Sequence, residues 1–196
     1  MVNNLVFTTK SGHFFIFQPM SDILASQIIF GNLKELMRAK NTAHESIFKF
    51  HWKKMWPFNM FWPQVDFNRI VRLMGEIRKN TITQKNLVAQ AKPKAKDFEK
   101  KFLNAVPTYL DYMDASCKLL GDIAQWKQDM LEKKIHKDVK FKRDVSEWSR
   151  LLKEYEDAQG NLVRAGAIVS IGWNDFVAAG GFVEPEASAP DTQPAP

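Results

Sequence analysis

The fold is decided by one long stretch, FEKKFLNAVPTYLDYMDASCKLLGDIAQWKQDMLEKKI, residues 98–135. Its large apolar side chains recur at intervals of three or four residues, except for one interval of seven residues. This period is typical of one face of an α-helix. The stripe comprises Phe98, Phe102, Val106, Leu110, Met113, Cys117, Leu120, Ala124, Leu131 and Ile135. The spacing predicts a long amphipathic helix that buries this face against other helices.

A second apolar stripe lies upstream of this helix. Its first four members are Phe67, Ile70, Met74 and Ile77, and it continues more weakly as far as Val88. Asp66 comes directly before it and is expected to cap the helix N-terminus. Pro93, within the segment KPKAK, predicts a turn between this helix and the next. The two helices are therefore expected to run antiparallel.

Downstream, a third stripe begins near Val139. Its members are Phe141, Val145, Trp148, Leu152, Tyr155 and Leu162. Gly160, Gly166 and Gly172 follow, so the segment AGAIVSIGWNDFVAAGG, residues 165–181, is expected to form a separate last helix that packs closely on a neighbour. Residues 183–196 are rich in Pro and Ala with acidic residues, a composition that predicts a disordered tail.

Residues 1–64 are interpreted as an apolar and aromatic arm with short helices. Ser21 is expected to cap a helix that ends near Ala39, with a break at Asn41 and Thr42. The side of this helix expected to be apolar comprises Ile23, Gln27, Phe30, Leu33 and Met37. With a helical bundle over residues 65–182, the prediction is an all-α fold. It is an elongated antiparallel bundle or coiled coil with an irregular N-terminal arm and a disordered C-terminal tail.

The arm ends in IFKFHWKKMWPFNMFWPQVD, residues 47–66, where two prolines prevent a continuous helix. Aromatic rings favour a boundary between an apolar phase and water. The aliphatic part of a lysine side chain can pack beside such rings while its charged end stays in water. The candidate surface-binding residues are Trp52, Trp56, Phe58, Phe61, Trp62, Lys53 and Lys54. Two interpretations stay open: an anchor on an apolar polymer or lipid surface, or a plug at the end of the bundle.

Charge and cysteine content limit the function classes. The net charge of +6 allows an anionic partner, but the lysine runs are interspersed with acids, which is typical of a solvated helix face. A nucleic-acid partner is therefore not expected. The single cysteine, Cys117, excludes a disulfide within the chain and lies on an apolar stripe, so we expect a buried side chain.

No sequence motif predicts catalysis, a metal site or a cofactor. The chain has no G-x-S-x-G, H-E-x-x-H, G-x-x-x-x-G-K-[ST] or G-x-G-x-x-G pattern. His44 and His51 are seven residues apart, yet no acidic cluster completes a ligand set, and the histidines are expected to be exposed or capping. No apolar run is long enough to span a membrane, and no secretory signal is expected, while a mitochondrial transit peptide stays open.

The segment FWPQVDFNRIVRLMGEIRKNTITQKN, which begins at Phe61, resembles the start of the phasin family, the amphipathic helical proteins that coat polyhydroxyalkanoate granules. The resemblance rests on Pro63, Asp66-Phe67, Leu73-Met74-Gly75 and Arg78-Lys79-Asn80. The Ala/Pro-rich tail is similar too. The resemblance implies a role at a granule surface, with no catalytic residues to carry over.

The function expected from these features is that of a non-enzymatic amphipathic helical protein that binds an apolar polymer or lipid surface. It would form a homo-oligomer or pair with partner helices, in the cytoplasm, at a granule or membrane surface. The alternative is a helical structural subunit of a larger membrane-associated or mitochondrial assembly.

Overall fold

The computed structural model describes residues 25–48, 65–131 and 138–181, with the side chains of residues 131 and 138–144 left out. These ranges contain four long helices and one short one. They are α1 (Ala25–Phe48), α2 (Phe67–Ala91), the 3-10 helix η3 (Lys92–Lys94), α3 (Asp97–Leu131) and α4 (Asp138–Ala178). No strand occurs within the described ranges, so the prediction of an all-α fold is confirmed.

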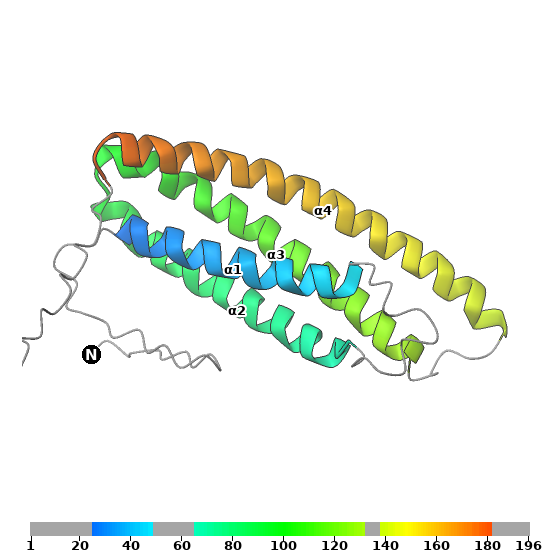
Figure 1. Ribbon diagram of the computed structural model, residues 1–196. Coiled ribbons are helices and arrows are strands. Elements are labelled where there is room, and N and C mark those ends of the chain that lie inside the picture. Colours follow the sequence, from blue (N-terminus) through cyan, green and yellow to red (C-terminus); the bar gives the residue numbers. More distant parts are fainter. Residues whose placement is uncertain (1–24, 49–64, 132–137, 182–196) are drawn as a thin grey trace, which may run out of the picture.

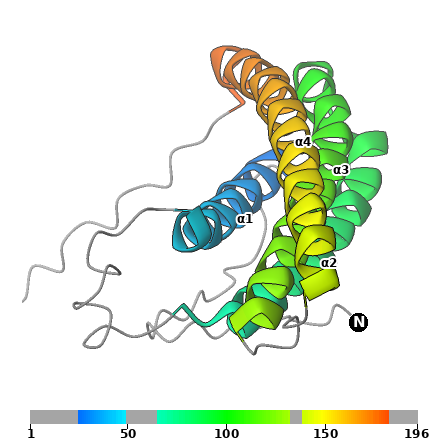
Figure 2. The same cartoon turned by 90° about the vertical axis from the view of Figure 1, so that its right-hand side faces the viewer.

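The four helices run alternately up and down in an elongated bundle (Figure 1). α3 lies in the middle of a curved layer and packs along both α2 and α4. α1 lies on one side of this layer and packs mainly on α2 (Figure 2). We call the side of the layer that α1 covers its inner face. The apolar side chains of all four helices join there in one hydrophobic core.

The helices share one packing pattern, in which buried positions alternate in steps of three and four residues. In α2 they are Phe67, Ile70, Met74, Ile77, Thr81, Gln84 and Val88. In α4 they are Leu151, Tyr155, Ala158, Leu162, Ala165, Val169, Gly172 and Phe176. This spacing is typical of knobs-into-holes packing between antiparallel helices. α3 has neighbours on two sides and therefore buries a wider face.

The prediction of short helices in the N-terminal arm is wrong for residues 25–48. α1 is one helix of 24 residues that continues through Asn41 and Thr42. Its buried residues are Ser26, Ile29, Leu33, Leu36, Lys40, Ala43 and Ile47. Two polar residues occupy core positions in this stripe, and an apolar periodicity cannot reveal such positions. The sequence interpretation therefore selected the wrong face and an early end.

The prediction of a separate last helix is also wrong, because α4 runs unbroken over 41 residues. Two of its glycines, Gly166 and Gly172, lie against α3. A Cβ atom at Gly172 would lie 2.9 Å from the Cα of Phe102. The stripe also differs from the prediction, since Leu151 is buried, Leu152 is only half-buried and Val145 is exposed.

Three local predictions are confirmed. The side chain of Asp66 accepts a hydrogen bond from the Arg69 backbone N–H at 2.9 Å, which caps α2. Pro93 lies in the short η3 turn between α2 and α3. Cys117 is fully buried, and burial raises the pKa of its thiol to about 12. The thiol therefore stays protonated and unreactive.

Candidate functional site

All seven residues of the candidate aromatic anchor lie within residues 49–64, outside the described residues, so that assignment stays a prediction. The described residues on either side of the stretch meet at Lys127 of α3. Its Nζ donates a hydrogen bond to the backbone oxygen of Ile47 at 3.1 Å. The same nitrogen lies 5.6 Å from the ring centroid of Phe48 and 5.9 Å from that of Phe67. Both ends of the aromatic stretch are thus held at one end of the bundle.

A group of large apolar side chains is exposed on the C-terminal half of α4. The exposed fractions are 69% for Val163, 58% for Ile168, 53% for Ile171 and 40% for Val177. We call these four residues the α4 patch. Ile168 also forms a wall of a shallow groove between α3 and α4. Ile168 and Ile171 lie one helical turn apart, and exposed apolar side chains that lie together mark sites where a protein contacts an apolar partner.

A buried lysine lies where α1 meets α3 and α4. Lys40 is 1% exposed, and its Nζ donates a hydrogen bond of 2.6 Å to Oε1 of Gln159. Among the described residues, no carboxylate forms an ion pair with it. Removing an ammonium from water without a counter-charge is costly. Burial accordingly lowers the pKa of Lys40 from 10.5 to about 8.

The hydrogen bonds around Lys40 form a chain that joins three helices. Ser116 of α3 donates to the same Gln159 oxygen at 3.2 Å, and Gln159 Nε2 donates to the Tyr155 hydroxyl at 3.0 Å. That hydroxyl lies 2.8 Å from Nδ1 of His44 on α1. We call these five residues the Lys40 network. Its bonds are satisfied when the Tyr155 hydroxyl donates to a neutral imidazole.

Burial and the charge of Lys40 favour the neutral form of His44. Burial lowers its pKa, the positive charge of Lys40 adds to this effect, and Glu45 opposes it. Burial also raises the pKa of Tyr155 above its ordinary value, so its hydroxyl keeps its proton. The sequence interpretation placed His44 as an exposed or capping residue, and this is wrong: it is half-buried and bonded across the helix interface.

Polar contacts continue towards the other end of α1. Ser26 donates a hydrogen bond of 2.7 Å to Oε1 of Glu99, and both side chains are buried. Asn32 donates to Gln84 of α2 at 3.2 Å. The seam beneath α1 therefore combines apolar packing with hydrogen bonds along much of its length.

The Lys40 network has limited chemical scope. Its amine is enclosed, so no substrate reaches it in this conformation. Within the described ranges, no group of three or more His, Cys, Asp or Glu side chains could hold a metal ion. None of the described helices is both long and apolar enough to cross a membrane. What the arrangement supplies is an apolar surface outside and a polar seam inside.

Sequence reasoning missed both the Lys40 network and the α4 patch. The position of Lys40 in the sequence could have indicated its burial, because Lys40 continues the spacing of three and four residues set by Leu33 and Leu36. The signal for the patch was the presence of Val163, Ile168 and Ile171 away from the stripe that includes Tyr155 and Leu162.

Comparison of the chain with protein-family models, with curated proteins and with solved structures found no match.

Proposed function

We propose that this protein is a non-enzymatic amphipathic helical protein that adsorbs to an apolar surface. The observation that carries the proposal is the α4 patch, in which four aliphatic side chains of one long helix remain in water. Transfer of such side chains from water to an apolar phase is favourable by about 25 cal/mol per Å². A long helix can present this area along a flat surface.

The specific surface that the phasin resemblance implies is that of a polyhydroxyalkanoate granule. Two features support an apolar polyester as the partner: the α4 patch, and the aromatic stretch that begins and ends at one end of the bundle. The net positive charge of the chain would additionally favour a granule that carries anionic groups.

The first test removes the α4 patch. Val163→Ser, Ile168→Ser and Ile171→Ser together are expected to lower adsorption to poly(3-hydroxybutyrate) particles at least threefold, because the apolar area that enters the interface is reduced. Adsorption is measured by co-sedimentation of the full chain with the particles. The fold should be retained, since exposed substitutions usually change stability by only about 0.5 kcal/mol.

A matched control is available on α2. Ile82 and Leu87 are also exposed, at 58% and 37%, but lie on another helix. Ile82→Ser with Leu87→Ser is expected to leave adsorption near that of the unchanged protein. Equal adsorption of the α4 variant and the unchanged protein would refute the role of the patch.

The second test addresses the aromatic stretch. Trp52→Ala, Trp56→Ala and Trp62→Ala together are expected to weaken adsorption further, because interfacial tryptophans contribute strongly at a boundary between apolar matter and water. Tryptophan fluorescence should shift to the blue when the unchanged protein adsorbs. If the triple variant adsorbs as well as the unchanged protein, the stretch is a plug of the bundle rather than an anchor.

The alternative function is a helical subunit of a larger assembly, in which a partner helix would cover the α4 patch. The same aliphatic side chains would suit that role. Analytical ultracentrifugation separates the two. We expect a chain that stays dispersed and well folded without any partner, whereas a chain that is stable only in a complex would favour the assembly subunit.

A further inference from the structure

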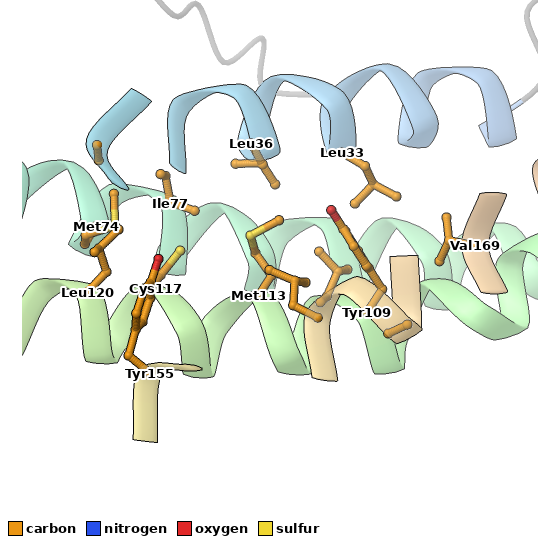
Figure 3. Close-up of a cluster of buried hydrophobic side chains, with 14 of the residues drawn as sticks. Leu33, Leu36, Met74, Ile77, Tyr109, Met113, Cys117, Leu120, Tyr155 and Val169 are labelled. Atoms are coloured by element: carbon orange, nitrogen blue, oxygen red, sulfur yellow. The ribbon is translucent and has the colours of Figure 1, made fainter. Parts of the chain in front are cut away.

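α2, α3 and α4 form a layer, and α1 covers the inner face of that layer. α3 packs along both of its neighbours, while α1 makes far fewer contacts with any of them. Figure 3 shows Leu33 and Leu36 of α1 pointing toward Tyr109 and Met113 of α3. Tyr109 and Met113 are buried, at 5% and 0% exposure. Without α1, this inner face would present a broad apolar surface.

The seam that holds α1 is unusually polar for a core. Ser26, Asn32, Lys40 and His44 each form a hydrogen bond with another helix. Groups of this kind recover bonds to water when a seam opens, so each stabilises the closed form only modestly. Lys40 gains most from opening, because its ammonium then becomes hydrated.

We infer that α1 is a detachable cover, and that the inner face of the α2–α3–α4 layer is a second surface-binding face that becomes available when α1 leaves. The inference rests on the proposed function, because the occupant that replaces α1 is the apolar polymer surface. Lys40 weakens the closed form and so keeps the cover releasable. The α4 patch makes the first contact while the cover is still closed.

The groups that face Lys40 do not supply a negative charge near neutral pH, so its buried ammonium continues to weaken the closed form. From α4 it faces Tyr155, and from α3 it faces Cys117, neither of which ionises near neutral pH. On α1 itself, Lys40 acts electrostatically on His44, one helical turn away.

Asp114 of α3 lies near Cys117 and is already paired, because Arg78 of α2 binds it at 2.9 Å.

The experiment compares three full-length variants by amide hydrogen exchange at pH 7, without any surface present. In the unchanged protein, residues 25–48 should exchange well before residues 98–124. Lys40→Met should slow exchange of residues 25–48 at least tenfold, because the uncompensated charge is gone. Lys153→Met removes a charge from an exposed site of α4 and should change nothing. Leu36→Ala should act in the opposite direction and speed exchange of α1 alone.

The same variants are then mixed with poly(3-hydroxybutyrate) particles. Lys40→Met should adsorb at least threefold more slowly than Lys153→Met, and Leu36→Ala faster. The inference is overturned if α1 and α3 exchange together, or if Lys40→Met adsorbs at the control rate. If the unchanged protein does not adsorb at all, the proposed function fails, while the exchange data still decide whether α1 is a detachable cover.

Discussion

Lys40→Met is expected to raise the free energy of unfolding at pH 7 by about 2 kcal/mol. Each tenfold change in a protonation equilibrium is worth about 1.4 kcal/mol, so the fall in the pKa of Lys40 from 10.5 to about 8 corresponds to about 3 kcal/mol. The variant also loses the hydrogen bond to Gln159, which offsets about 1 kcal/mol of the stability gained by removing the charge. Methionine has a similar length and fills the space of the lysine stem.

The stability that Lys40→Met gains over the unchanged protein should shrink as the pH rises. Below about pH 8 the amine is protonated in both the folded and the unfolded chain, and the folded chain bears the full cost of burial. Between about pH 8 and 10.5 the unfolded chain binds more protons, so the stability of the unchanged protein rises with pH. Above about pH 10.5, Lys40 is neutral in both the folded and the unfolded chain, so burying it no longer lowers the stability of the fold. Lys40→Met should lack this rise.

Urea unfolding of both proteins at a series of pH values between 6 and 11 measures the difference directly. Lys153→Met serves as the control for loss of one positive charge, and its stability should follow that of the unchanged protein. A Lys40→Met protein that is less stable than the unchanged one at pH 7 would mean that the amine stabilises the core through its hydrogen bond.

Gly172→Ala is expected to lower the free energy of unfolding by about 1–2 kcal/mol. The added Cβ would lie 2.9 Å from Cα and 3.0 Å from N of Phe102. Both are backbone atoms, which cannot rotate away as a side chain can, so α3 and α4 must separate locally. Overpacking of this kind costs about 1–3 kcal/mol, and the better helix propensity of alanine offsets up to about 1 kcal/mol of it.

The same helix offers a control of opposite sign. At Gly160 the added Cβ meets nothing within 4 Å, so Gly160→Ala should raise stability by about 0.5–1 kcal/mol. Gly166 is intermediate, since its Cβ would lie 3.4 Å from the ring of Tyr109. Thermal or urea unfolding of the three variants gives the order. Equal effects at Gly160 and Gly172 would contradict the close approach of α3 and α4.

The sequence predicted a helix well where the buried positions of that helix are apolar, and poorly where some of them are polar. α2 and α3 were predicted closely, because Phe67, Ile70, Met74 and Ile77 are all buried, as are the members of the α3 stripe from Phe102 to Ala124. α1 was predicted poorly, because Ser26 and Lys40 interrupt the apolar pattern although both are buried. Polar residues in a core are stabilised by partners on other helices, and those partners are distant in the sequence.

The candidate site shows the same division. Gln159 lies 119 positions from Lys40, and Tyr155 lies 111 positions from His44. No local pattern links them, so the network could be found only when α1 was seen beside α4. The exposed state of Val163 and Ile171 likewise depended on which side of α4 meets α3.

By itself, the sequence determined that the chain forms long amphipathic helices, where α2 begins, where the chain turns before α3, and that Cys117 lies in a core. These features depend on residue type and spacing over one or two helical turns, which are local properties. The packing of the helices was needed to show that α1 belongs to the bundle, that α4 is a single helix and that Lys40 is buried with no carboxylate paired to it among the described residues. Those outcomes depend on which helix faces which, and therefore on packing free energy summed over segments that are far apart in the chain.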